Sequence, residues 1–433
     1  MKHRARDIAE AALDLRDKGV PPDAGAVPLA DVAARNWNLL AEDLPLPAAV
    51  IRRSALHHNS AWMRDFIAQR GLDLAPHGKT TMAPALFDLQ LDDGAWGITV
   101  GTAHQIQVAR SFGYNRLFLA NQLVGRAAID YVLRELARDP AFEFYCLVDS
   151  VANVAALTAA ANRIAPGRPL SVLVELGYPG GRTGCRTIAE AMTVARAVAA
   201  SGGALALRGI EGFEGLFKEA TPEVTAARVT AFLDDVVALA GNCAAEGLFA
   251  PGAVILSAGG SSFYDLVAAR FGAADLGRDK IVLLRSGCYI THDSIMYVRA
   301  FDALGRRDPA LAATGGGLRP ALEVWAYVQS RPEPEKAIVG LGKRDLSHDD
   351  LPLAQRWYRP GEGGALRDVA AGHVVTRLND QHCHLTIPGE SPLQVGDMVA
   401  FGISHPCLTF DKWRVIHLVD DDYRVVQSIR TYF

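Results

Sequence analysis

The chain has 433 residues, which is enough for two or three domains of ordinary size. Hydrophobic residues make up 50% of the chain and charged residues 21%, and this balance excludes a mainly disordered protein. The net charge is −4 without a basic face or a run of like charges, so nucleic acid and anionic membranes are not expected partners.

Neither a membrane span nor a secretion signal is expected. No stretch of about 18 apolar residues occurs. The N-terminal stretch MKHRARDIAEAALDLRDKG carries acidic residues where a signal peptide needs an apolar core. We therefore expect a cytoplasmic protein. Its cysteines contain no CxxC pair, which favours reduced thiols over a disulfide framework; they are Cys146, Cys185, Cys243, Cys288, Cys383 and Cys407.

The chain begins with residues 1–45, which we interpret as an N-terminal extension that packs on a C-terminal β domain. The run PAAVIRR at 47–53 predicts a strand that lies outside the main sheet. A helix is predicted next, with Asn59 or Ser60 as its N-cap and Gly71 as its end.

From residue 46 to residue 310, short apolar runs alternate with segments of helical period. Four apolar residues of one such segment, Ile129, Val132, Leu133 and Leu136, have the spacing of a helix that packs on a sheet. Eight repeats of this kind predict an α/β fold, a TIM-type (β/α)8 barrel. The predicted strands are 72–75, 95–100, 116–120, 142–148, 171–176, 206–213, 253–258 and 281–285.

After residue 310 the pattern changes to strand-like runs separated by turn residues. Residues 311–433 therefore predict an antiparallel β domain. The runs are 321–330, 372–378, 382–388, 397–403, 413–419 and 423–429.

Lys79, in PHGKTT at 76–81, directly follows the first predicted barrel strand. Active sites of parallel barrels lie at the C-terminal ends of the strands, so an inward Lys79 would stand at the mouth. An amine that is shielded from water there has a lowered pKa and can form a Schiff base. The motif alone favours the simpler interpretation of a lysine on a surface loop.

Glycine-rich turns follow three later strands. Gly259, Gly260 and Ser261 in SAGGSS offer N–H groups and a hydroxyl to a phosphate, and RSGCY places Gly287 and Tyr289 after the next strand. Arg182 in GGRTGC could donate to a phenolate or carboxylate, or it could be a solvated arginine in a turn.

SHPC, in the β domain, contains His405 and Cys407, which project to one face of an extended segment. An imidazole and a thiolate together favour Zn²⁺, although a chance pair would look the same. QHCH places His382 and His384 on one face and Cys383 on the other. These histidines are candidates for metal ligands, substrate contacts or polar positions on a strand.

Taken in order, PHGKTT, GGRTGC, LRGIEGFEG, SAGGSS, RSGCY, DQHCH and SHPC resemble the pyridoxal-phosphate enzymes of the alanine racemase-like fold. The resemblance is to the D-serine dehydratase and D-threonine aldolase branch, and it runs from about residue 46 to the end. It implies that Lys79 carries pyridoxal phosphate and that Arg182 contacts its phenolic oxygen. It also implies a divalent metal, Zn²⁺ or another cation, on His405 and Cys407. The implied cofactor-binding residues are Lys79, His77, Arg182, Gly259, Gly260, Ser261, Gly287, Cys288 and Tyr289, and His382 is an implied catalytic residue beside Lys79.

The implied activity is a PLP- and Zn-dependent dehydration of D-β-hydroxy amino acids such as D-serine or D-threonine, which releases a 2-oxo acid and ammonia. The main alternative is cleavage to glycine and an aldehyde. Racemisation and a non-catalytic PLP-binding role are two further alternatives. The resemblance also implies a homodimer whose active site lies at the interface. One departure is that Thr81 and Met82 stand where family members have histidine and lysine.

Overall fold

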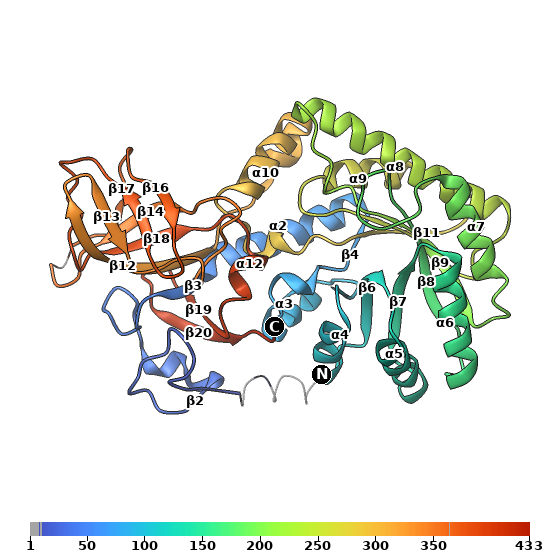
Figure 1. Cartoon of the computed structure of the whole chain (residues 1–433), viewed down its shortest axis with the longest axis horizontal. Coiled ribbons are helices and arrows are strands. Elements are labelled where there is room, and N and C mark those ends of the chain that lie inside the picture. The colour runs from blue at the N-terminus through green and yellow to red at the C-terminus, as the bar shows by residue number, and fades with distance from the viewer. Residues whose placement is uncertain (1–7, 9–10, 363) are drawn as a thin grey trace.

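The computed structural model describes residues 8, 11–362 and 364–433. Parallel strands with surrounding helices form one part of the molecule, and a mainly antiparallel β region forms the other (Figure 1). Among the described helices, none combines the length and the apolar composition needed to cross a bilayer. The expectation that the chain has no signal peptide rests on its N-terminal stretch. Residues 1–7, 9 and 10 of that stretch lie outside the described residues.

The parallel strands form one sheet in the order β4-β11-β10-β9-β8-β7-β6-β5. The sheet curls so that its end strands meet: Trp96 N donates to Leu74 O at 2.7 Å, and Thr99 N donates to Pro76 O at 3.0 Å. The predicted α/β barrel is therefore confirmed with all eight of its strands. They are β4 (Asp73–Leu74), β5 (Ile98–Val100), β6 (Arg116–Gln122), β7 (Glu143–Val148), β8 (Leu170–Leu176), β9 (Leu205–Gly212), β10 (Val254–Ala258) and β11 (Lys280–Leu284).

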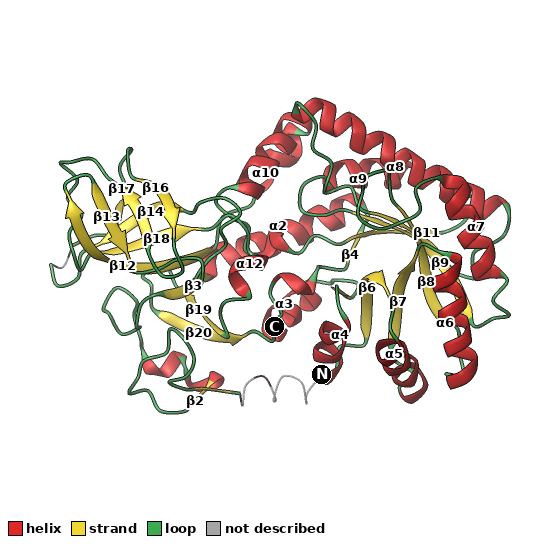
Figure 2. Ribbon diagram, viewed as in Figure 1, coloured by secondary structure: helices red, strands yellow, loops and turns green. Residues whose placement is uncertain are grey.

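Helices follow the strands in sequence and cover the outer face of the sheet (Figure 2). The apolar stripe predicted over Ile129, Val132, Leu133 and Leu136 is buried on α5, as its spacing requires. The helices of this part are α2 (Arg53–Arg70), α3 (Pro84–Asp92), α4 (Ala103–Ser111), α5 (Arg126–Arg138), α6 (Val151–Ile164), α7 (Ile188–Ala199), α8 (Pro222–Ala245), α9 (Tyr264–Ala273), α10 (Met296–Arg307) and α11 (Pro309–Ala313).

The predicted start of α2 is wrong, whereas its end at Gly71 is confirmed by a left-handed C-cap with φ 61°. The helix begins at Arg53, directly after strand β3 (Ala48–Arg52), and no side chain caps it. Asn59 lies inside the helix because its amide is needed elsewhere: it donates to Arg319 O at 2.8 Å and accepts from Arg319 N at 2.8 Å. Ser60 donates instead to Asp93.

The second sheet runs β15-β14-β18-β12-β13-β17-β16, and β3, β19 and β20 extend it. All six predicted runs are strands here, and β3 pairs with β12 and β19 outside the barrel, as predicted. Strands β13 to β15 were missed because polar residues interrupt them. The strands are β12 (Leu322–Glu333), β13 (Lys336–Val339), β14 (Leu353–Tyr358), β15 (Arg367–Asp368), β16 (Val374–Leu378), β17 (Cys383–Thr386), β18 (Met398–Gly402), β19 (Val415–Val419) and β20 (Val425–Arg430), with helix α12 (Cys407–Phe410) between β18 and β19.

The N-terminal segment contains a short hairpin of β1 (Ala12–Leu13) and β2 (Val27–Pro28). Its apolar side chains, such as Leu13 and Val27, share a buried cluster with Trp325 and Met398 of the second sheet. Burial of these residues holds the segment against the β region.

Candidate functional site

The inside of the barrel is divided into an apolar layer and a polar layer. Phe118, Leu147, Leu173, Ile255 and Leu283 fill the apolar layer. Toward the C-terminal ends of strands β8 to β11, buried polar groups replace these apolar side chains. These are Glu175 on β8, Glu211 on β9, Ser257 on β10 and Arg285 after β11. The sequence analysis did not predict these residues. A charged residue two positions after an inward apolar residue of a strand could have indicated them.

A cavity of about 290 Å³ opens above this polar layer. Lys79, Arg182 and Arg285 make its wall cationic, which suits an anionic ligand. The structure thus brings the predicted residues Lys79, His77, Arg182, Gly259 and Gly260 around one cavity. The other lining residues are Gly101, Thr102, Gln105, Ala120, Asn121, Glu175, Glu211, Phe213 and Arg285.

Lys79 belongs to a 3₁₀ turn, Gly78–Thr80, at the mouth of the barrel, which we call the lysine turn. Its side chain lines the cavity but is exposed in the single chain, so the expectation of an amine shielded from water is not met there. The physical reason is that the turn stands at the open end of the barrel, above the polar layer. His77 precedes it, and burial together with the charges of Lys79 and Arg285 holds the pKa of His77 well below its usual value.

The floor of the cavity contains a buried ion pair between Arg285 and Glu211. Arg285 also donates to Ser257 Oγ at 2.6 Å. Burial raises the pKa of Glu211 to about 8, although Arg285 opposes this shift. Oε2 of Glu211 and Nδ1 of His77 are buried without a hydrogen-bond partner, so the cavity offers two unsatisfied polar atoms to a ligand.

Glu175 is buried nearby, and neutral donors satisfy its carboxylate. Gln122 donates to Oε2 at 2.5 Å and Thr183 donates to Oε1 at 2.7 Å. Arg182 lies in the loop between β8 and α7, and its guanidinium carbon stands 4.9 Å from the ring centre of Phe213. This stacking directs the arginine over the cavity that both residues line.

The predicted phosphate donors Gly259 and Gly260 already have a partner. Their N–H groups donate to the two carboxylate oxygens of Glu214, each at 3.1 Å. In the structure the turn therefore binds a carboxyl group of the same chain, and its contact with a phosphate stays a prediction. Burial raises the pKa of Glu214. A phosphate could use these N–H groups only after the carboxylate moves.

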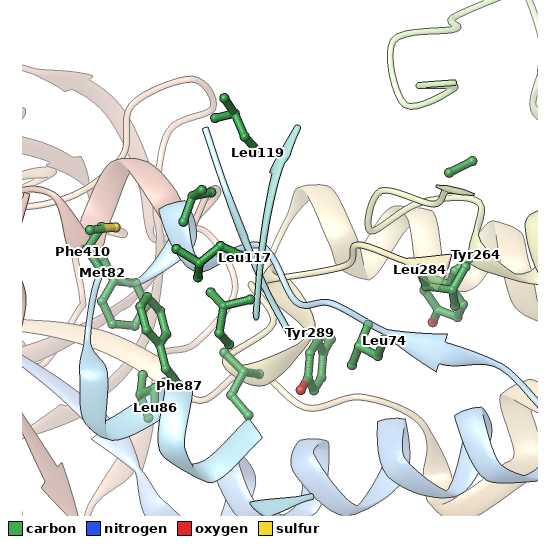
Figure 3. Packing of buried hydrophobic residues seen from close by; sticks show 14 of the residues in the cluster. Leu74, Met82, Leu86, Phe87, Leu117, Leu119, Tyr264, Leu284, Tyr289 and Phe410 are labelled. Atoms are coloured by element: carbon green, nitrogen blue, oxygen red, sulfur yellow. The ribbon is translucent and has the colours of Figure 1, made fainter. Parts of the chain in front are cut away.

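The other predicted phosphate-side residues lie outside the set that lines the cavity. Ser261 follows the Gly259–Gly260 turn and is partly buried. Gly287 packs against the backbone of the lysine turn. Tyr289 lies in the hydrophobic core and its hydroxyl accepts from Gln90 at 3.3 Å; Figure 3 shows it near Leu74. Contacts of these residues with a cofactor stay predictions.

Cys407 begins α12 and contacts the turn that carries Lys79, and His405 lies two residues before it. Cys407 Sγ lies 3.4 Å from Thr80 Oγ1 and 3.6 Å from Cys288 Sγ. The contact with Cys288, followed by the influence of His405, holds the pKa of Cys407 well below its usual value. Burial opposes a charged imidazole, but Cys407 and Asp349 outweigh it and raise the pKa of His405 to about 9.

The donor chemistry of this pair fits a metal ion. A thiolate and an imidazole are ligands that Zn²⁺ prefers, and Asp349 Oδ2 lies 2.7 Å from His405 Nδ1, as a carboxylate does behind many metal-binding histidines. In the described part of the chain, no three His, Cys, Asp or Glu side chains are already gathered around one point.

His382 is exposed in the turn before β17, outside the residues that line the cavity. Nε2 of His384 lies 2.7 Å from Oδ1 of Asn379, a contact within the same hairpin. The structure therefore does not bring either histidine to Lys79 within one chain, and the catalytic role of His382 stays a prediction.

The two residues that depart from the family pattern are buried. Thr81 accepts a hydrogen bond from Ala83 N at 3.3 Å. Met82 packs in the core beside Phe410 of α12, as Figure 3 shows. These positions connect the lysine turn to the helix that carries Cys407, rather than supplying a charge to the cavity.

Comparison with known proteins agrees with this geometry. Residues 321–419 match a family model described as "Putative serine dehydratase domain". The chain is 26% identical over 343 residues to D-threo-3-hydroxyaspartate dehydratase of Delftia sp. (strain HT23), which covers 78% of this chain and 83% of the relative. A solved structure of a dehydratase of that name, a cysteine-to-alanine mutant in the metal-free form, has a TM-score of 0.69 at 23% identity over 92% of this chain and 99% of the other.

Two further solved structures have the same fold. D-threonine aldolase from Filomicrobium marinum has a TM-score of 0.72 at 22% identity and covers 92% of this chain and 96% of its own. Alanine racemase from Bacillus anthracis has a TM-score of 0.56 at 14% identity over 89% of this chain and 97% of its own. The chain thus has the alanine racemase-like fold that its motif order predicted, and residues 321–419 resemble the serine dehydratase domain.

Proposed function

We propose that this protein is a pyridoxal-phosphate- and metal-dependent lyase that dehydrates D-β-hydroxy amino acids to a 2-oxo acid and ammonia. The observation that carries the proposal is the 3.4 Å contact between Thr80 and Cys407. Thr80 directly follows Lys79 in the chain, and Cys407 forms the candidate metal-binding pair with His405. An amine that can bind an aldehyde and a pair that can bind a metal stand together, although 327 positions separate Thr80 from Cys407.

The cavity fits the cofactor in charge and in size. Its volume of about 290 Å³ is just below the roughly 300–1,000 Å³ of ligand pockets. Lys79 would hold the cofactor's carbonyl carbon through Nζ, and Arg182 would donate to its phenolate. When bound, pyridoxal phosphate supplies an electron sink for negative charge at the substrate's Cα. The orphaned polar atoms of His77 and Glu211 are further candidate contacts.

The residues of the chain then have separate tasks. Lys79 Nζ, once free, is the base for the α-proton because it lines the cavity at its mouth. His405 and Cys407 would hold a divalent cation, of which Zn²⁺ suits them best, and this ion supplies Lewis acidity for departure of the β-hydroxyl. The buried Arg285–Glu211 pair keeps the floor of the cavity rigid.

We also propose that a second copy covers the mouth of the barrel. Lys79 is exposed in the single chain, and exposed apolar side chains follow several strands at the same end of the barrel. They are Val124 after β6, Val151 after β7 and Leu216 after β9. Light scattering should give the mass of a dimer, and Leu216→Asp should shift it toward the monomer. A monomer in the unchanged protein would contradict this part of the proposal.

The function is tested by incubating the protein and pyridoxal phosphate with D- and L-serine, threonine and threo-3-hydroxyaspartate, with and without Zn²⁺ or a chelator. Ammonia and a 2-oxo acid should appear from D-substrates alone and should stop on chelation. If the products are glycine and an aldehyde, the reaction is aldol cleavage and the proposed dehydration is wrong. If the protein binds the cofactor but turns over none of these substrates, it is a non-catalytic binding protein. Lys79→Ala should remove the visible absorbance of the lysine-bound cofactor, and Lys343→Ala on the surface should not.

A further inference from the structure

We propose that Cys288 is a third metal ligand, which completes a set of two cysteines and one histidine with His405 and Cys407. The inference rests on the proposed function, because the metal is part of that function. It adds a ligand from the loop after β11 of the barrel to the pair on the β region, so that the ion would tie the two parts of the chain together.

The distance between the two sulfur atoms fits a shared zinc ion. Zn–S bonds are about 2.3 Å long, so two thiolates of a tetrahedral site stand roughly 3.8 Å apart. Cys288 Sγ and Cys407 Sγ are 3.6 Å apart in the structure. The pair therefore needs little rearrangement to bind one ion.

The two cysteines come from separate elements that meet at Thr80. Cys288 begins a 3₁₀ turn, Cys288–Ile290, after β11, and its sulfur lies 3.8 Å from Thr80 Oγ1. Cys407 begins α12 and lies 3.4 Å from the same hydroxyl. The remaining cysteines have other surroundings: the Cys185 thiol, for example, donates to Asp149 O at 3.2 Å, and Cys146 and Cys383 lie in the core.

His405 is placed to supply the nitrogen ligand. Its Nδ1 lies 2.7 Å from Asp349, which leaves Nε2 for a metal. The three donors are not yet gathered around one point in the described residues, so a shift of these side chains would accompany binding of the ion.

The charge of the set suits its surroundings. Cys288 is buried and Cys407 is largely so. Two thiolates neutralise Zn²⁺, whereas one thiolate would leave a net positive charge in a place with little water. Three protein ligands also leave one position of a tetrahedral ion open, which is the pattern of catalytic zinc sites. The open position would take the substrate hydroxyl.

The test measures how many thiolates bind the metal ion and does not depend on enzymatic activity. The full-length protein is kept under a reductant, freed of metal with a chelator and loaded with Co²⁺, whose near-ultraviolet charge-transfer band grows with the number of bound thiolates. Zinc affinity is measured in parallel by competition with a chromophoric chelator. The variants are Cys288→Ser and Cys407→Ser, and Cys383→Ala serves as a control for the loss of a buried thiol elsewhere.

Cys288→Ser and Cys407→Ser should each lose about half of the band, since one of two thiolates is removed, and zinc affinity should fall by about tenfold or more. Cys383→Ala should change neither. If Cys288→Ser folds poorly by circular dichroism, Cys288→Asp keeps an anionic donor and should bind zinc more tightly than Cys288→Ala.

A full band and unchanged zinc affinity in Cys288→Ser would overturn the inference and leave the proposed function standing. Equal zinc affinity in Cys288→Asp and Cys288→Ala would overturn it as well. An unchanged protein that binds neither Co²⁺ nor Zn²⁺ would overturn the inference together with the metal part of the proposed function.

Discussion

Gly287 packs so closely against the lysine turn that a Cβ atom on it would stand 2.5 Å from the carbonyl oxygen of His77. The same atom would stand 2.7 Å from Thr80 Oγ1. The loop that follows β11 therefore fixes the position of the turn that carries Lys79. This contact connects the last strand of the barrel with the first.

Gly287→Ala should displace the lysine turn, because a Cβ at 2.5 Å from backbone cannot be accommodated without movement. We expect a loss of about 1–3 kcal/mol in the free energy of unfolding and weaker covalent capture of pyridoxal phosphate. Urea denaturation and the absorbance of the bound cofactor measure the two effects. Gly241→Ala in α8, where nothing lies within 4 Å, is the control and should stabilise by about 0.5–1 kcal/mol. Equal behaviour of the two variants would contradict the close packing.

Glu214→Ala should leave the N–H groups of Gly259 and Gly260 without an acceptor. Each unsatisfied buried group costs about 1–3 kcal/mol, so the variant should unfold at a lower temperature. The freed N–H groups should then donate to a bound phosphate. Inorganic phosphate should therefore raise the melting temperature of the variant more than that of the unchanged protein, and an identical response of both proteins would argue against an anion site at this turn.

Glu211→Ala should be strongly destabilising, because it leaves the buried guanidinium of Arg285 without its ion partner. Breaking such a pair costs about 3–5 kcal/mol. The double variant that also has Arg285→Ala should lose less than the sum of the two single variants, since it removes both charges. Urea denaturation of the four proteins measures the coupling, and additive losses would show that the pair does not act as a unit.

His417 should make stability fall in acid. Burial lowers its pKa to about 4, and its ring lies 2.7 Å from Ser428 Oγ and 2.9 Å from Gly19 O. The unfolded imidazole takes up its proton near pH 6.5, before the folded one does. Stability present above pH 6.5 is therefore lost as the pH falls toward 4, by up to about 3 kcal/mol.

The pH dependence is measured as the free energy of unfolding of the unchanged protein and of His417→Gln between pH 7 and 4. The variant should have the flatter curve because its side chain does not titrate. Parallel curves would mean that the imidazole of His417 takes up its proton as readily in the folded protein as in the unfolded one. His292, whose pKa burial also lowers to about 4, is retained in both proteins, so its contribution cancels.

Local patterns in the sequence determined most of the fold. The barrel strands are mainly apolar runs because both faces of a parallel sheet are buried, and such runs are visible without knowledge of the neighbours. Lys79 and Arg182 were placed at the mouth because strand ends in a parallel barrel share one edge. The start of α2 was misplaced because Asn59, a good capping residue, is used for a contact with Arg319, 260 positions away.

Only the tertiary structure decided which groups meet in the site. That Glu214 occupies the N–H groups of Gly259 and Gly260 depends on the packing of the loops after β9 and β10. The contact of Cys288 with Cys407 depends on how the barrel and the β region fit together. Contacts of this kind join side chains that lie far apart in the sequence, whereas strand and helix patterns arise from the periodicity of neighbouring residues. For this reason the sequence could point to candidate residues such as Lys79 and Arg182 but not to the groups that surround them.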